Sequence, residues 1–306
     1  MLGEVGLVRV AFLLVPVLPR SVIVTLARCF GTMGYFLAAG TRRIGLANLD
    51  MAYGAALPQA QKRRILRDSF RTFALVILDL FWFGRRTRQR IAAWVDVDPS
   101  FDRYTAQKPM IAVTAHVGNW EVLGLTAALR GSESATVAAE IKNPAVELML
   151  NRVRQATGQK LVERRGAVRS LLKELRGGGT VALVLDQNTA PEEGGVFVDF
   201  FGSPVPVSAA GAALAAKTGA GIVLVFCVPE ARGRYRVSAL PRMHVKLGDP
   251  DAIREGTRAL ARGIEAEIRR HPGQWLWTYK RWKYIPRGVP REKYPFYAHY
   301  VRSEED

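Results

Sequence analysis

Residues 110–121 of the chain, Met-Ile-Ala-Val-Thr-Ala-His-Val-Gly-Asn-Trp-Glu, contain an apolar run followed by a polar turn. An uninterrupted apolar run of this length is typical of a strand that is buried on both faces, as strands of parallel sheets are. Gly118 and Asn119 indicate a turn and a helix cap, so we expect a helix from Trp120. The stretch therefore predicts a strand, a tight loop that carries His116, and a helix that starts directly after the loop.

The same alternation of short apolar runs and helical patterns continues along the chain. It predicts further strands at residues 135–140, 180–185, 222–228 and 234–240, and helices at 120–130, 144–157, 166–175, 209–218 and 252–270. Such alternation is typical of an α/β fold. We expect a single domain at residues 42–290 with a mixed, mostly parallel sheet flanked by helices. N-terminal hydrophobic helices would precede it at residues 1–41, and a tail would follow at 291–306.

The composition is that of a folded and strongly cationic protein. The 306 residues include 44 Lys and Arg against 27 Asp and Glu, a net charge of +17, and 49% are hydrophobic. This apolar content excludes a disordered polycation. Cys29 and Cys227 lie far apart, so we expect neither a disulfide framework nor a zinc ribbon. The charge predicts an anionic partner, such as nucleic acid, a membrane surface, an acidic protein or a phosphorylated ligand.

Two apolar segments near the N-terminus favour a membrane surface among these partners. Residues 7–18 are interrupted by Arg9 and Pro16, and residues 21–39 contain one charged residue, Arg28. A spanning helix needs about 20 apolar residues, so the first segment is too short and the second is borderline. We expect peripheral attachment through interfacial helices, with a single N-terminal anchor or an ordinary core helix at 21–39 as the alternatives.

His116 and Glu121 are candidates for acid–base chemistry. The turn leaves His116 in the loop and places Glu121 in the first turn of the helix, where the helix dipole favours an ionised carboxylate. Such a carboxylate can hold the imidazole in the tautomer whose other ring nitrogen is free to act as a base. That base could take a proton from a hydroxyl that attacks an activated acyl group. A buried, structural histidine is the alternative interpretation.

Several segments that follow one another along the chain carry a family resemblance. They are Arg42–Leu49, Ala115–Glu121, Asp186–Asn188 with Gly195–Gly202, and Pro272–Trp277 with Lys280–Lys283. In these segments the chain resembles the bacterial lipid A biosynthesis late acyltransferases (the lauroyl and myristoyl transferases), within the lysophospholipid acyltransferase superfamily. The second segment is similar to the His-x4-acidic catalytic motif of that superfamily. An ordered set of segments is more specific than one motif.

The resemblance implies a membrane-associated O-acyltransferase. It would move a fatty acyl chain from a thioester of acyl carrier protein or coenzyme A to a hydroxyl of a lipid A precursor, an anionic glycolipid or phospholipid acceptor. His116 would be the general base and Glu121 its orienter. We expect no cofactor, metal ion or nucleic acid. The enzyme would lie on the cytoplasmic face of the bacterial inner (cytoplasmic) membrane.

The resemblance also implies roles for further residues. Arg164, with Arg165 as its rival, and Asn119 would bind the developing oxyanion or the acyl donor. Asp199 is a second candidate orienter, because mycobacterial relatives that acylate phosphatidylinositol mannosides carry a carboxylate before a similar Phe-Phe-Gly segment. The residues after the strand at 180–185 are candidates for binding the hydroxyls of the acceptor, with capping and turn formation as the alternative: Asp186, Gln187 and Asn188.

Two kinds of alternative function stay open. With the same chemistry, the acceptor could be another glycolipid, an aminolipid or a lysophospholipid, for example of the phosphatidylinositol mannoside type. Outside that chemistry, the protein could be a non-catalytic membrane-binding module. It could also bind single-stranded nucleic acid through the aromatic and cationic residues that alternate in residues 275–294, although no nucleic-acid motif accompanies them.

Overall fold

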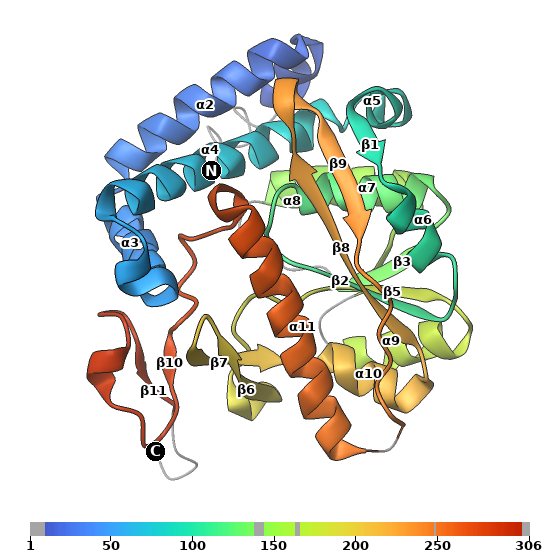
Figure 1. Cartoon of the computed structure of the whole chain (residues 1–306). Coiled ribbons are helices and arrows are strands. Elements are labelled where there is room, and N and C mark those ends of the chain that lie inside the picture. The colour runs from blue at the N-terminus through green and yellow to red at the C-terminus, as the bar shows by residue number, and fades with distance from the viewer. Residues whose placement is uncertain (1–9, 138–143, 163–165, 248, 302–306) are drawn as a thin grey trace.

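The strand predicted around residue 110 is β2 (Met110–Thr114), and it lies at the centre of the structure between β8 (Gly221–Pro229) and β5 (Thr180–Val184). The computed structural model describes residues 10–137, 144–162, 166–247 and 249–301. Within these residues, seven strands form one sheet in the order β1-β9-β8-β2-β5-β3-β4 (Figure 1). The outer strands are β1 (Val95–Val97), β3 (Ser134–Val137), β4 (Lys160–Val162) and β9 (Tyr235–Ala239).

The direction of the strands confirms the predicted sheet. Strand β2 is parallel to β5 and β8, and β3 is parallel to β4 and β5. Strands β8 and β9 are antiparallel, and β1 is parallel to β9. The sheet is therefore mixed and mostly parallel, and the carboxyl ends of β2 and β5 lie next to each other at the same edge, where sites of α/β proteins are built.

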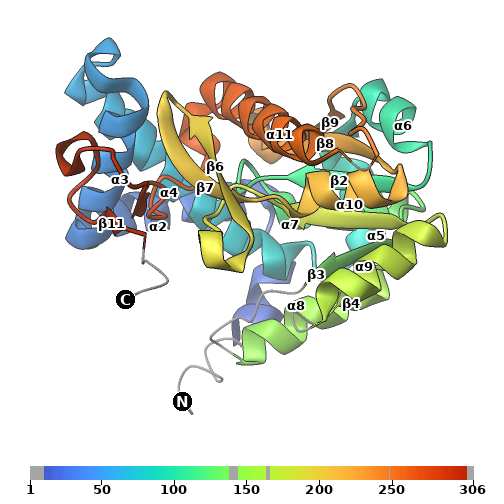
Figure 2. The same ribbon diagram turned by 90° about the horizontal axis from the view of Figure 1, so that it is seen from below.

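Helices cover both faces of the sheet, because successive side chains of the central strands point to opposite faces. Ile111 and Val113 pack in one apolar cluster, whereas Met110 lies in the other. The first cluster is covered by α9 (Ala167–Arg176), α10 (Ala210–Thr218) and α11 (Pro250–Arg270), and the second by α5 (Thr87–Trp94), α6 (Pro99–Thr105) and α7 (Trp120–Leu129). Figure 2 shows α11 and α7 on opposite sides of the sheet. The predicted flanking helices are thus confirmed.

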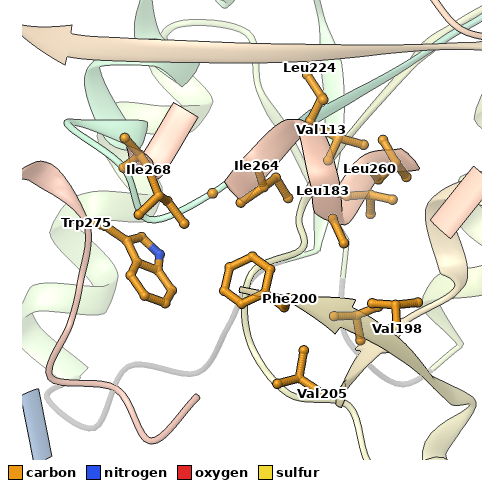
Figure 3. Packing of buried hydrophobic residues seen from close by; sticks show 14 of the residues in the cluster. Val113, Leu183, Val198, Phe200, Val205, Leu224, Leu260, Ile264, Ile268 and Trp275 are labelled. Atoms are coloured by element: carbon orange, nitrogen blue, oxygen red, sulfur yellow. The ribbon is translucent and has the colours of Figure 1, made fainter. Parts of the chain in front are cut away.

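The core under α11 joins the sheet to the C-terminal segment. Val113, Leu183 and Leu224 of three neighbouring strands face Leu260 and Ile264 of α11 (Figure 3). Burial of each such aliphatic side chain contributes roughly 1.5–3 kcal/mol. The cluster continues to the hairpin of β6 (Gly195–Phe200) and β7 (Ser203–Ser208) and to the tryptophans that follow α11. The edge of the sheet next to residue 116 is therefore supported by a continuous apolar core.

Three N-terminal helices pack beside the sheet. They are α2 (Arg20–Leu37), α3 (Ala39–Tyr53) and α4 (Gln59–Trp82), and α2 lies alongside α4 (Figure 1). A Cβ atom on Gly31 would lie 2.4 Å from the Cα atom of Arg71, so the two helices approach each other at backbone distance. The apolar segment predicted at 21–39 is thus a helix with one face packed on α4.

The opposite face of α2 is exposed and apolar. Phe30, Met33 and Leu37 lie one turn apart and are 47%, 52% and 74% exposed. None of the described helices is by itself long and apolar enough to cross a membrane, whereas α2 and residues 39–56 meet both criteria together but are bent by 92°.

Some elements were not predicted from the sequence. They are the helix α3, the short strands β1 and β4, the helices α5 and α6, the hairpin β6–β7, and the pair of two-residue strands β10 (Tyr284–Ile285) and β11 (His299–Tyr300). All but α3 are short. Helix α8 (Pro144–Ala156) is present as predicted, while residues 138–143, which include the end of the strand predicted at 135–140, lie outside the described residues.

Candidate active site

The loop after β2 is held from two sides. The Gly118 N–H donates to the Gln274 carbonyl at 2.9 Å, and the Asn119 N–H donates to the Cys227 carbonyl of β8 at 2.8 Å. Gly118 has a φ of +65°, and a Cβ atom there would lie 2.1 Å from the Cys227 oxygen. Glycine is therefore required at this position, because any side chain would collide with the backbone of β8.

His116 is paired with Asp186, which follows β5. The ring Nδ1 lies 2.8 Å from Asp186 Oδ1, and the backbone N–H of His116 donates to Asp186 Oδ2 at 3.0 Å. Trp275 Nε1 donates to the same Oδ2 at 2.8 Å. An ionised carboxylate accepts and does not donate, so Nδ1 carries a proton and Nε2 keeps its lone pair. The arrangement leaves Nε2 of His116 available as a base.

The charges around the pair favour the ionised carboxylate. Burial raises the pKa of Asp186, but the charge and hydrogen bonds of His116 and the hydrogen bond from Trp275 lower it by more, so this pKa lies below its ordinary value. Burial lowers the pKa of His116, but the charge of Asp186, the hydrogen bond to it and the charge of Glu121 raise it by more. The pKa of His116 therefore lies above its ordinary value of 6.5.

Glu121 lies near His116 but is bound by a different group. Arg154 of α8 donates to it through two nitrogens, at 2.5 Å from Nη2 to Oε1 and 3.1 Å from Nε to Oε2. The two side chains are 15% and 14% exposed. Glu121 therefore acts on His116 through its charge, while its oxygens form a bidentate pair with the arginine.

Asn119 caps α7 as predicted, and its side chain points into the interior. Its Oδ1 accepts from the Val122 N–H at 3.0 Å. Its Nδ2 donates to Asp79 Oδ2 at 3.2 Å and to the Tyr235 hydroxyl at 3.0 Å. The residue is fully buried, so its amide contacts protein groups rather than the opening beside His116.

Asp199 and Asn188 form hydrogen bonds with groups other than the imidazole. Asp199 is exposed and accepts from the Gly202 N–H at 3.1 Å, within the turn of the β6–β7 hairpin. Asn188 accepts from Arg281 Nη1 at 2.7 Å and donates to the Lys280 carbonyl, so its amide fixes the C-terminal segment. Gln187 is exposed on the loop after β5. The rivals Arg164 and Arg165 lie outside the described residues.

His116 lies in an opening between α4 and residues 274–276, and its side chain is 19% exposed. Phe73 of α4 forms part of the same wall and is 42% exposed. The ring of Trp120 lies 4.6 Å from that of His116, in an edge-to-face contact. The imidazole can therefore be reached from outside, and both polar and apolar side chains line the opening.

Trp120 also lines a second, mostly apolar pocket. It has room for about 100 Å³, the same order as the roughly 150 Å³ cavity that takes up benzene in an engineered protein. Small residues of β2, β5 and α7 leave this space free: Ala112, Ala182, Gly124 and Ala127. Phe101 and Met110 also line the pocket, as do the charged residues Glu121 and Arg154. Trp120 thus lines both the opening at His116 and an apolar pocket with room for a small apolar group.

Metal-binding side chains do not gather here. In residues 10–137, 144–162, 166–247 and 249–301, no three His, Cys, Asp or Glu side chains lie as a metal site would require.

The sequence of this chain matches the family described as bacterial lipid A biosynthesis acyltransferase over residues 4–284, and the chain belongs to this family. The resemblance seen in the ordered segments is thereby confirmed. The match spans the loop with His116, the strand end with Asp186 and the segment with Trp275.

Individual relatives are similar over different lengths. The phosphatidylinositol mannoside acyltransferase of Mycobacterium tuberculosis (strain CDC 1551 / Oshkosh) is 30% identical over 171 residues, which cover 55% of this chain and 52% of that protein. The chain thus spans about half the length of these mycobacterial relatives. The lipid A biosynthesis palmitoleoyltransferase of Escherichia coli (strain K12) is 24% identical over 278 residues, 89% of this chain and 88% of that protein.

One solved structure is also similar. The 1-acyl-sn-glycerophosphate acyltransferase PlsC from Thermotoga maritima matches with a TM-score of 0.36 and 17% sequence identity, covering 81% of this chain and 97% of that chain.

We predict that Gly118→Ala destabilises the protein by more than about 2 kcal/mol, because it combines a left-handed backbone conformation with a collision. Gly131→Ala is the matched control, since Gly131 also has a positive φ but no atom lies within 4 Å of a Cβ built there. The control should cost about 1–2 kcal/mol. Urea unfolding of both variants measures the difference, and equal costs would show that the contact with β8 is not limiting.

Proposed function

We propose that this protein is a membrane-associated O-acyltransferase that moves a fatty acyl chain from an acyl carrier protein or coenzyme A thioester to a hydroxyl of a lipid A precursor. The observation that carries the proposal is the hydrogen-bonded pair of His116 and Asp186, with Nε2 free at an opening beside an apolar pocket. It occurs in a chain of the lipid A acyltransferase family. A non-catalytic membrane-binding module or a nucleic-acid binder would need neither the pair nor the pocket.

In the proposed reaction His116 acts as the general base. Its Nε2 takes the proton of the acceptor hydroxyl while that oxygen forms a bond to the thioester carbonyl carbon. The tetrahedral oxyanion then collapses, the carbon–sulfur bond breaks, and the imidazolium returns the proton to the leaving thiolate. Asp186 holds the ring by Nδ1 and stabilises the imidazolium. This proposal gives Asp186 the orienting role that the sequence suggested for Glu121 or Asp199.

The apolar pocket suits the acyl chain of the donor. Trp120 lines the pocket and its ring contacts His116, so an acyl chain that lies in the pocket would keep its thioester near Nε2. The net charge of +17 suits the anionic donor and acceptor. The exposed apolar face of α2, together with Leu13, Leu14 and Val17, supports peripheral seating on a membrane, which we place at the cytoplasmic face of the inner membrane.

A phosphatidylinositol mannoside type of glycolipid is the second candidate acceptor. The Mycobacterium tuberculosis relative named for that acceptor is 30% identical to this chain, against 24% for the palmitoleoyltransferase named for lipid A, although over a shorter stretch. Incubating the purified protein with both acceptors and with both kinds of acyl thioester, followed by mass spectrometry of the lipids, distinguishes the two candidates. Absence of acyl transfer to every lipid hydroxyl would contradict the proposal.

His116→Ala should lower kcat by about 100-fold or more, because a general base contributes at least that factor. His244→Ala is the control, since His244 is exposed and lies away from the opening. Thioester consumption and lipid product are measured for both variants. Near-normal turnover by His116→Ala would remove the imidazole from the mechanism.

The pH dependence tests which carboxylate orients the ring. The base works when neutral, so kcat/KM should fall as the pH drops through the raised pKa of His116, above 6.5. Asp186→Asn removes the charge that raises the pKa of His116 most and keeps the burial that lowers this pKa. The fall of kcat/KM on the acidic side of the pH profile should therefore move to lower pH, and the maximal kcat/KM should drop. Glu121→Gln should move this fall less, and Asp199→Asn should not move it. A larger loss in Glu121→Gln than in Asp186→Asn would identify Glu121 as the orienter.

Ala127→Leu should shift donor preference toward shorter acyl chains, because the added methyl groups would fill part of the apolar pocket. Ala93→Leu on α5 is the control, as Ala93 is exposed and does not line the pocket. Competition between donors of different length gives the preference directly. An unchanged length profile in Ala127→Leu would exclude the pocket as the site of the chain.

A further inference from the structure

A buried ion pair connects helix α2 to the end of α4. The guanidinium of Arg20 donates through Nη1 and Nη2 to both carboxylate oxygens of Asp79, and its Nε donates to the Gly233 carbonyl at 2.9 Å. The side chains are 2% and 1% exposed. The guanidinium also lies over the rings of Trp82 and Phe83, with 4.9 Å and 5.4 Å to the ring centroids. Hydrogen bonds and aromatic rings therefore hold the guanidinium in place.

The same carboxylate reaches the loop of the active site. Asp79 Oδ2 accepts from the Tyr235 hydroxyl of β9 and from Asn119 Nδ2. The Asn119 amide also donates to the Tyr235 oxygen at 3.0 Å. Asn119 is three residues after His116, and its own N–H is bound to β8. The loop is thus fastened at its start by Asp186 and at its end by the Asp79 network.

Stability alone does not account for this network. Burying an ion pair costs several kcal/mol in desolvation, and apolar residues of similar volume often give an equally stable interior. Capping of α7 does not require it either, because the cap uses Asn119 Oδ1, whereas the network uses Nδ2. What the network adds is a fixed direction for the Asn119 amide, and with it a fixed end of the loop.

We propose that Arg20, Asp79 and Tyr235 are positioning residues for His116, acting through the side chain of Asn119. The inference rests on the proposed role of His116 as the base. Nε2 must meet the acceptor hydroxyl within hydrogen-bond reach, and a displacement of about 1 Å can cost about 100-fold in rate. Because the loop is short, a change in the position of Asn119 would be passed on to the backbone that carries the imidazole.

Asn119→Ser separates the cap from the network, because a serine hydroxyl can still cap α7 but does not reach Asp79 as the amide does. Tyr235→Phe is a milder variant that removes a single hydroxyl from the same network. Each should lower kcat by about 10-fold or more, with the KM values for donor and acceptor within about 2-fold. Asp102→Asn is the control, since it breaks another bidentate pair, with Arg130, at the opposite end of α7 from the loop.

A readout independent of turnover is the NMR signal of the His116 ring, which must be told apart from only three other histidines. Its ring signals should shift in Asn119→Ser and Tyr235→Phe and stay unchanged in Asp102→Asn. If the ring signals and kcat per folded molecule are unchanged in both network variants, the proposal is overturned, even if both melt at lower temperature. If the unmodified protein transfers no acyl group, the proposed function fails, while the ring signals still decide the positioning role.

Discussion

The carboxylate of Asp186 brings three distant parts of the chain together. It binds the ring and the backbone of His116, 70 residues earlier, and the indole of Trp275, 89 residues later. The first two meet because β2 and β5 are parallel neighbours, so that the residues after each strand emerge at one edge of the sheet. Trp275 is brought there by the packing of the buried tryptophans against Phe200 and α11. The site exists only when all three segments have folded.

Three hydrogen bonds to one buried carboxylate also determine which proton can move. They offset the cost of desolvating Asp186, so it remains ionised and the proton stays on Nδ1 of His116. Glu121 adds a second negative charge nearby, and its oxygens are bound to Arg154. The two carboxylates therefore differ in role although both raise the basicity of one imidazole.

Much of the fold could be predicted from the sequence, because the spacing of apolar residues and the residue types at turns are local properties. The strand at residue 110, the cap Asn119 and the final helix are cases of this kind. The partners of the imidazole depend on the topology of the sheet instead. From the sequence, Asp186 is a candidate for binding the hydroxyls of the acceptor, and only the pairing of β2 with β5 places its carboxylate against Nδ1 of His116. Trp275 and Arg154 carry no local signal, since their contacts depend on how the C-terminal segment and α8 pack.

The position of Arg20 has a consequence for any attempt to shorten the protein. Helix α2 resembles a detachable apolar leader, and removing it would be an obvious route to a more soluble protein. Yet the deletion would remove Arg20 and leave the buried carboxylate of Asp79 without its ion-pair partner. Such a change typically lowers the free energy of unfolding by about 3–5 kcal/mol. Solubility is better sought by replacing the outward residues of α2, such as Phe30 and Met33, with polar ones while the arginine is kept.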